Sequence, residues 1–241
     1  MKKEIIIKRY KSGQITEEKD FVASEKNIEL LINNKAKLNV SMSPGDLNAF
    51  AYGFLLTSGL IKAKGDVREL TILGDRIEVE LPILPKEFKF FLPSGCGGGS
   101  LLDVEIPKRS FKEILFPDLE NLPVLFKQFN CDSAVFAETG GVHSAAISDG
   151  NAIRFFSEDI GRHNAVDKVI GKALLQDVDF NSLFLLTSGR ISAEIVKKVF
   201  YAGLRSIVSR SAPTCAAIVR ARRSKIGIIG FLRGSRFNIY T

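Results

Sequence analysis

The chain has few cysteines and histidines, the residues that build disulfide frameworks and zinc sites, and it has no long apolar run. It contains three cysteines and two histidines among 241 residues. The cysteines are odd in number and widely spaced, which fits a reducing cytoplasm better than a disulfide framework and matches no zinc-binding spacing. No apolar stretch is long enough to span a bilayer, and the apolar run near the N-terminus is too short for a signal peptide. We therefore expect a cytoplasmic protein without a bound metal and without a membrane partner.

The composition is that of a soluble, basic globular protein. Hydrophobic residues make up 45% and charged residues 25% of the chain, with a formal net charge of +7. A basic protein favours an anionic partner, which could be nucleic acid, a nucleotide or an acidic protein surface. Because the sequence contains no basic helix, zinc finger or RNP-like aromatic motif, we expect no nucleic-acid partner. The positive charge is better suited to the phosphates of a dinucleotide.

Residues 1–92 are expected to form a smaller, strand-rich N-terminal unit with one helix. Alternating hydrophobic residues and turn residues predict strand pairs at 4–9 with 15–23, 28–33 with 36–41, and 68–73 with 76–81. The helix is expected to start after Asp46, with an apolar stripe from Leu47 to Leu55, and to end near Gly59.

Residues 93–117 are expected to form a loop and linker. The segment 95–100 contains four glycines and Cys96, and so many glycines disfavour a regular element. Free cysteines are usually buried, whereas a cysteine in such a loop can reach a partner. We interpret Cys96 as a reactive thiol; the alternative is a flexible linker with an incidental cysteine.

Residues 118–241 alternate between predicted helices and strands. The order α-β-β-α-β-α-β-α-β predicts a three-layer α/β sandwich with a mixed sheet. This is the topology of cytidine-deaminase-like proteins, whose helix starts carry His-x-Glu and Cys-x-x-Cys zinc motifs. The corresponding starts here are His163-Asn164-Ala165 and Ser188-Gly189-Arg190-Ile191, without the glutamate and the thiols. The sequence therefore disfavours zinc-dependent deamination on the expected fold.

Polar segments at 159–164, 187–192 and 209–214 follow predicted strands of this second unit. In open α/β sheets, ligands bind at the carboxyl ends of strands, beside helix N-termini whose free N–H groups suit anions. Arginine side chains bind phosphate through paired hydrogen bonds. The arginines expected near these strand ends are Arg162, Arg190, Arg210, Arg233 and Arg236. We interpret the region as a phosphate or nucleotide site; capped helices with unrelated surface arginines are the alternative.

Several longer motifs occur in order over most of the chain. They are Ser43-Pro44-Gly45-Asp46, Gly95-Cys96-Gly97, Thr139-Gly140-Gly141-Val142-His143, the run from Glu158 to Lys168, Ser188-Gly189-Arg190-Ile191-Ser192, Ser211-Ala212-Pro213-Thr214, and Gly230-Phe231-Leu232-Arg233. Together they resemble the FdhD family, the sulfur carriers needed for formate dehydrogenase.

The resemblance implies a cytoplasmic homodimer with a deaminase-like core. Such a protein takes persulfide sulfur from a cysteine desulfurase and transfers it to the metal of the molybdenum (or tungsten) bis-guanine-dinucleotide cofactor of formate dehydrogenase. By the same resemblance, Cys96 would carry the persulfide. The residues then expected at the cofactor are Phe231, Leu232, Arg233, Gly234, Ser235, Arg236, Arg162, His163, Asn164, Ser188, Gly189, Arg190 and Ser211. Asp159 and His163 could position the cofactor or handle protons.

The chain departs from the family pattern in the cysteine loop. The family usually has Cys-Gly-x-Cys-Gly, whereas Gly99 stands here at the second cysteine position. No second loop thiol can therefore relay the persulfide or release it by exchange. Cys131 and Cys215 are expected to be structural. Two functions stay open: a single-cysteine sulfur carrier, and a cofactor-binding chaperone for formate dehydrogenase that transfers no sulfur.

Overall fold

The computed structural model describes residues 1–82, 90–91, 101–102 and 110–241. The predicted cysteine loop, including Cys96 and Gly99, lies outside the described residues. Among the residues that are described, no helix is long and apolar enough to cross a bilayer.

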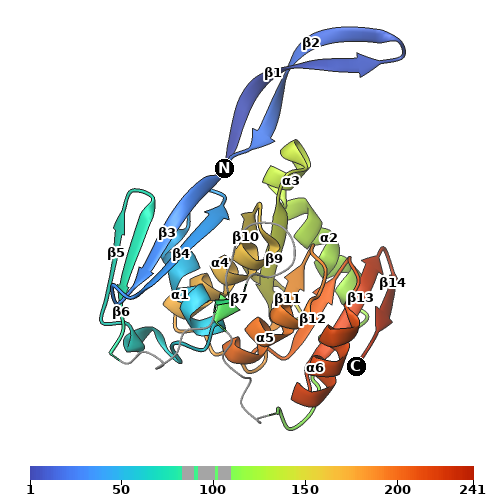
Figure 1. Ribbon diagram of the computed structural model, residues 1–241. Coiled ribbons are helices and arrows are strands. Elements are labelled where there is room, and N and C mark those ends of the chain that lie inside the picture. The colour runs from blue at the N-terminus through green and yellow to red at the C-terminus, as the bar shows by residue number, and fades with distance from the viewer. Residues whose placement is uncertain (83–89, 92–100, 103–109) are drawn as a thin grey trace.

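The N-terminal part consists of a projecting hairpin and a small sheet covered by one helix (Figure 1). The hairpin pairs β1 (Lys2–Lys11) with β2 (Gln14–Ala23). The small sheet has the order β4-β3-β6-β5, and α1 (Leu47–Thr57) packs on it. Its strands are β3 (Lys26–Ile32), β4 (Ala36–Met42), β5 (Glu69–Leu73) and β6 (Arg76–Glu80), and the single turn η1 (Lys64–Asp66) precedes β5. The three predicted strand pairs and the predicted helix are confirmed.

The C-terminal part is a six-stranded mixed sheet between two layers of helices. The strand order is β10-β9-β11-β12-β13-β14, in which only β11, β12 and β13 are parallel neighbours. The strands are β9 (His143–Ser148), β10 (Ile153–Asp159), β11 (Phe184–Thr187), β12 (Ser206–Ser209), β13 (Gly227–Arg233) and β14 (Arg236–Ile239). The short strands β7 (Phe90–Phe91) and β8 (Leu101–Leu102) pair separately.

Alternate strand residues face different helices, as the pleat of a strand requires. Ile147, Leu185 and Ile207 belong to the core beneath α4 (Arg162–Leu175), α5 (Ala193–Ala202) and α6 (Cys215–Ser224). Their neighbours Ala146, Leu186 and Val208 pack with α2 (Leu122–Asp132) on the other face. The predicted three-layer sandwich is confirmed. The short helix α3 (Ala134–Thr139), which follows α2, was not predicted.

Helix α4 lies at the centre of the molecule. It has α1 on one side and the large sheet on the other, so that 12 of its 14 residues are buried. Two glycines let the backbones of α1 and α4 meet. A Cβ on Gly53 would lie 1.8 Å from the Asp167 carbonyl oxygen, and a Cβ on Gly171 would lie 1.8 Å from the Ala49 carbonyl oxygen. Neither position has room for a side chain.

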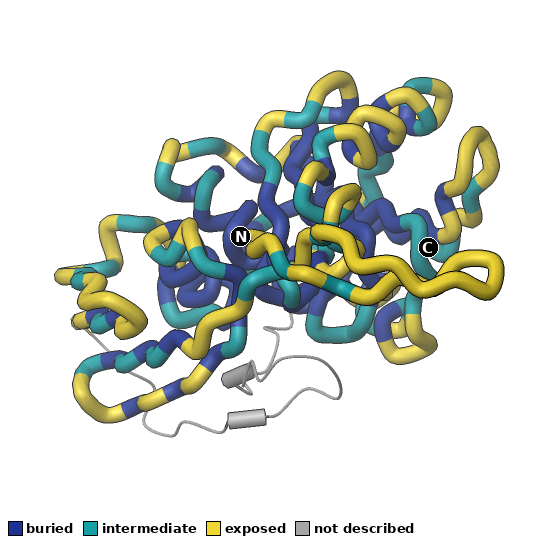
Figure 2. The backbone as a smooth tube through the Cα atoms, turned by 90° about the horizontal axis from the view of Figure 1, so that it is seen from above, coloured by how far each residue is buried: buried dark blue, intermediate teal, exposed yellow. Residues whose placement is uncertain are grey.

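One hydrophobic core extends through both parts of the chain. It contains residues of the small sheet and α1 together with residues of α4, α5 and α6. The domain boundaries stay a prediction; the sequence divides the chain into residues 1–92, 93–117 and 118–241. Figure 2 shows that burial is concentrated around this core, while the β1–β2 hairpin is exposed along most of its length.

We predict that Gly171→Ala destabilises the protein strongly, because the added methyl group forces α1 and α4 apart. Overpacking of this kind costs about 3 kcal/mol, which corresponds to a loss of roughly 6–12 °C in Tm for a chain of this size. Thermal unfolding followed by circular dichroism measures the shift. Gly65→Ala is the matched control, because a Cβ at Gly65 meets nothing within 4 Å. Equal Tm values for the two variants would contradict the close helix contact.

Candidate functional site

A cleft of about 970 Å³ lies between α2 and the carboxyl ends of β11, β12 and β13. Ser188 follows β11, Ser211 follows β12, and residues 231–234 form the end of β13 and its turn. The opposite wall comes from α2 and α3, with Phe126 and Phe136 among its residues. Carboxyl ends of parallel strands are the usual ligand position in an open α/β sheet, and the volume is that of a small-molecule site.

Phe231 lines this cleft in a strained backbone conformation. Its φ is +55°, in the left-handed region that bulky side chains avoid. The strain coincides with a register shift between β13 and β14, and the Phe231 N–H donates a hydrogen bond to the Ser211 carbonyl oxygen at 3.1 Å. The residue is 37% exposed. A strained, exposed aromatic ring in a cleft offers a flat surface for a planar ligand.

Phe136, another aromatic residue of the cleft, is held in place by a carboxylate that binds its backbone. Glu158, which is buried, accepts hydrogen bonds from the N–H groups of Val135 and Phe136 at 3.0 and 2.9 Å. The Arg210 guanidinium lies over the Phe136 ring, 4.7 Å from its centroid. This cation–π contact holds Arg210 at the wall of the cleft, where Arg233 adds another positive charge. The cleft thus combines aromatic surfaces with cations, which suits an anionic aromatic ligand.

The structure brings together some of the residues predicted from sequence and separates others. Seven predicted residues line the cleft: Ser188, Arg210, Ser211, Phe231, Leu232, Arg233 and Gly234. Ser235 and Arg236 are exposed in the following turn and at the start of β14, and Arg190 is exposed after β11. Arg162, His163 and Asn164 are buried at the start of α4. Gly189 is buried against Arg162: a Cβ added to Gly189 would lie 3.0 Å from the Cβ of Arg162.

The expected position of a ligand beside the N-termini of the helices that follow β10, β11 and β12 stays a prediction. Among the described residues that line the cleft, none belongs to α4, α5 or α6. Instead, α2 and α3 supply the helical wall, including Val124, Lys127, Asn130 and Phe136. The sequence analysis missed these residues. Val124 offers one signal in the sequence, because it is apolar although it lies outside the apolar stripe of α2. In the structure it is 67% exposed.

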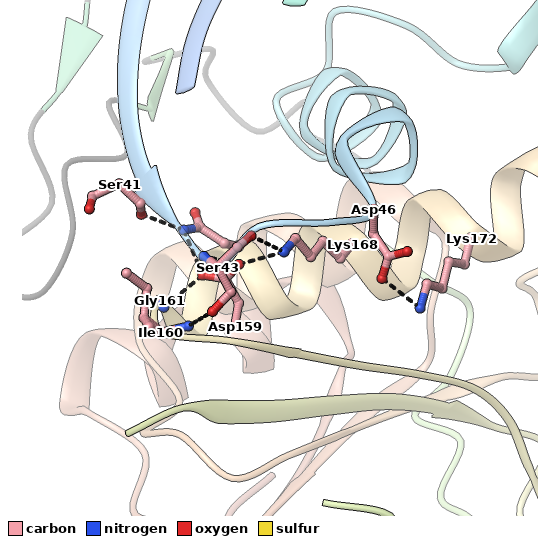
Figure 3. A network of polar contacts seen from close by, with 9 residues as sticks. Ser41, Ser43, Asp46, Asp159, Ile160, Gly161, Lys168 and Lys172 are labelled. Atoms are coloured by element: carbon pink, nitrogen blue, oxygen red, sulfur yellow. Dashed lines mark hydrogen bonds and ion pairs between the residues drawn. The ribbon is translucent and has the colours of Figure 1, made fainter. Parts of the chain in front are cut away.

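Asp159 is part of a buried network rather than of the cleft (Figure 3). Its carboxylate pairs with Lys168 at 2.7 Å and accepts the N–H of Ser43 at 3.0 Å. It also accepts the N–H of Gly161 at 2.8 Å and the amide of Asn164 at 3.0 Å. All of its hydrogen-bonding capacity is therefore used within the fold. The predicted cofactor or proton role of Asp159 has no support in this geometry.

A second ion pair crosses from α4 to α5. Lys198 lies 2.7 Å from the Asp167 carboxylate, which also accepts the Thr57 hydroxyl of α1 at 2.6 Å. Lys198 and Asp167 are both almost completely buried. Buried charges require partners of this kind. Together with the Asp159 network, this pair explains why a central helix with many polar residues can be buried.

The two histidines lie near the same strand ends. His143 Nδ1 is 3.4 Å from the Ser188 hydroxyl. Burial, together with the positive charges of Arg162 and Arg210, lowers the pKa of His143. Burial and the nearby Lys198 lower the pKa of His163 to about 3. His163 is therefore a neutral imidazole at physiological pH, and its Nε2 makes no hydrogen bond within the part of the chain that the structure describes.

The described residues contain no group of three or more His, Cys, Asp or Glu placed to hold a metal ion. Cys131 in α2 and Cys215 at the start of α6 are exposed free thiols. Their expected structural role is corrected, because a structural thiol is normally packed in the core. The predicted persulfide residue Cys96 lies outside the described residues, so its role stays a prediction.

The fold and the cleft define a mixed α/β protein with an open cleft at its strand ends. The family model of FdhD/NarQ matches residues 23–241. Protein FdhD of Methanocaldococcus jannaschii is 36% identical, with coverage of 100% of this chain and 97% of that protein. Sulfur carrier protein FdhD of Bacillus subtilis is 32% identical, with coverage of 97% and 93%. The chain therefore belongs to the FdhD/NarQ family.

A solved structure confirms the fold. A crystal structure of a protein named as a formate dehydrogenase accessory protein, from Desulfotalea psychrophila, matches with a TM-score of 0.80. The match covers 100% of this chain and 96% of that one at 24% identity. At this identity, the likeness shows the shared architecture.

We predict that burial of His163 makes the protein less stable in acid. The unfolded chain takes up a proton on this residue below pH 6.5, whereas the folded chain does so only near pH 3. The free energy of unfolding therefore falls as the pH drops from about 6.5 toward 3. His163→Gln should make this decrease shallower than in the wild type. Urea unfolding at pH 7, 6 and 5 measures the two slopes, and identical slopes would contradict the neutral buried histidine.

Proposed function

We propose that this protein is a sulfur carrier that serves formate dehydrogenase. Cys96 accepts persulfide sulfur from a cysteine desulfurase and transfers it to the metal of the molybdenum (or tungsten) bis-guanine-dinucleotide cofactor, which is the substrate. The names of its relatives, sulfur carrier protein FdhD among them, support the general role. The observation that carries the cofactor part is the cleft that contains Phe231, Arg210 and Arg233.

The cleft is suited to one guanine nucleotide of the cofactor. Phe231 offers the exposed ring on which a base can stack, and base–aromatic stacking contributes about 1–3 kcal/mol per base. Arg210 and Arg233 supply guanidinium groups for the phosphates. The hydroxyls of Ser188 and Ser211 stand at the ends of adjacent strands and can bind sugar or phosphate oxygens. The residues predicted by family resemblance and the cleft found by geometry agree at positions 231–234.

The sulfur chemistry requires only one loop thiol. The Cys96 thiolate attacks the terminal sulfur of the desulfurase persulfide, a new S–S bond forms on Cys96, and the desulfurase cysteine leaves as a thiolate. This exchange has no net oxidation or reduction. Because Gly99 replaces the second cysteine of the family loop, the outer sulfur would pass directly from Cys96 to the cofactor metal. The S–S bond breaks, Cys96 leaves as a thiolate, and the two electrons that turn the sulfur into a sulfide ligand come from the reduced metal of the substrate cofactor. We further propose that the protein works in the cytoplasm as a homodimer.

We predict that Phe231→Ala weakens binding of guanosine diphosphate about tenfold or more, because one stacked base is worth about 1.4 kcal/mol or more. Isothermal titration calorimetry measures the affinity. Phe21→Ala is the matched control, because Phe21 is also 37% exposed and lies in the β1–β2 hairpin. Equal affinities for the two variants and the wild type would contradict a base site at Phe231.

We predict that Cys96 gains one sulfur atom when the protein is incubated with a cysteine desulfurase and cysteine. Intact-mass analysis with peptide mapping measures the gain, which a reductant should remove. Cys96→Ala should gain none at this peptide and should still bind guanosine diphosphate, while Cys131→Ala should behave as the wild type. If the wild type gains no sulfur but binds the nucleotide, the chain is a cofactor-binding chaperone, the function that Gly99 favours.

A further inference from the structure

Helix α2 presents one face to the cleft. Val124, Lys127 and Asn130 line the cleft and are three positions apart, so they share a side of the helix. The other side of α2 is packed in the core through residues such as Leu125 and Phe129. We call Val124, Lys127 and Asn130 the α2 stripe. The stripe places an apolar group, a cation and an amide in a row along one wall of the cleft.

The two polar side chains of the α2 stripe are available to a ligand. Lys127 and Asn130 are exposed, and neither side chain bonds to another residue in the part of the chain that the structure describes. By contrast, Gln128 does not line the cleft and donates a hydrogen bond to Asp132 at 2.6 Å. Ser133, which also lines this wall, uses its hydroxyl within the fold.

The groups already proposed to hold the nucleotide do not select its base. Stacking on Phe231 is open to every base, because every base has a flat aromatic face. Arg210 and Arg233 are assigned to the phosphates, which all nucleotides share. Selection of guanine therefore requires groups that bind the edge of the base. The α2 stripe lies on the wall opposite the strand end that carries Phe231, so it faces the space that the base would occupy.

A lysine followed by an asparagine one helical turn later suits the edge of guanine. Guanine has acceptors at O6 and N7, whereas adenine has an amino donor in place of O6. The Lys127 ammonium group only donates, so it matches guanine at this position and opposes the amino group of adenine. The Asn130 amide has a carbonyl oxygen that can accept hydrogen bonds from the N1–H and the 2-amino group of guanine. Residues three positions apart are separated by about 4.5 Å along a helix, which lets the two side chains bind neighbouring groups of one base.

We propose that Lys127 and Asn130 make the cleft specific for guanine. Lys127 donates to O6 and N7 of the base, and Asn130 accepts from its N1–H and its 2-amino group. Val124, which is 67% exposed, provides an apolar surface beside the base. The inference rests on the guanine-nucleotide site of the proposed function and adds the residues that select the base. It is independent of the sulfur chemistry at Cys96.

The first test removes the lysine donor. In isothermal titration calorimetry, the wild type should bind guanosine diphosphate about tenfold or more tightly than adenosine diphosphate. Lys127→Met keeps an apolar stem and should lose most of this preference, because only the binding of guanosine diphosphate weakens. Lys8→Met is the matched control and should keep the preference, since Lys8 is an exposed lysine of β1 that does not line the cleft.

The outcomes of the first test separate the inference from the proposed function. If the wild type binds no guanosine diphosphate, the guanine site and the inference are both overturned. If the wild type binds both nucleotides equally, the inference alone is overturned. If Lys127→Met weakens both nucleotides by the same factor, Lys127 binds phosphate rather than the base, and the inference alone is again overturned.

The second test removes the 2-amino group from the ligand. Inosine diphosphate lacks this group but keeps O6, N7 and N1–H, so the wild type should bind it about fivefold more weakly than guanosine diphosphate. Asn130→Leu should bind the two nucleotides equally, because the acceptor of the 2-amino group is gone. Lys127→Met and the control Gln128→Leu should keep the wild-type ratio of the two affinities. An unchanged ratio in Asn130→Leu would overturn the assignment of Asn130 to the base.

Discussion

The buried ion pair between Asp159 and Lys168 holds the two parts of the molecule together. Asp159 ends a strand of the large sheet, Lys168 lies in α4, and both bind Ser43, which follows the small sheet. These atoms are removed from water, so each partner depends on the others for its hydrogen bonds. The glycine contact between α1 and α4 lies on the same side of the large sheet. The motifs at 43–46 and 158–168 are therefore two halves of one structural junction.

The wall of the cleft depends on Glu158, the neighbour of Asp159 in β10. Successive residues of a strand point to opposite faces, so Glu158 and Asp159 serve different layers of the sandwich. Asp159 fixes α4 on one face, while Glu158 fixes α3 and thus Phe136 on the other. Arg210 then lies on Phe136 at the wall of the cleft. One short strand end thereby connects the internal junction with the wall of the cleft.

Regular elements could be predicted from the sequence because their signals are local. Strand alternation, the helical stripes and turn glycines predicted the β1–β2 hairpin, the small sheet, the six-stranded sheet and five of the six α-helices of the described chain. The short pair β7–β8 was not predicted, and β8 lies in the segment expected to be a loop and linker. Helix α3 was missed because its six residues contain no buried residue and hence no apolar stripe. Phe136 was missed with it. Asp159 and Asn164 were expected at the ligand because the sequence does not show which groups they bind within the fold. Their partners Ser43 and Ser41 are more than 110 positions away in the chain.

A crystal structure of the protein with guanosine diphosphate tests the central claim most directly. We expect the guanine ring against Phe231, between α2 and the end of β13, with the phosphates near Arg210 and Arg233. The network around Asp159 should be unchanged, since it belongs to the fold. Nucleotide density at the N-termini of α5 and α6, away from Phe231, would contradict the account.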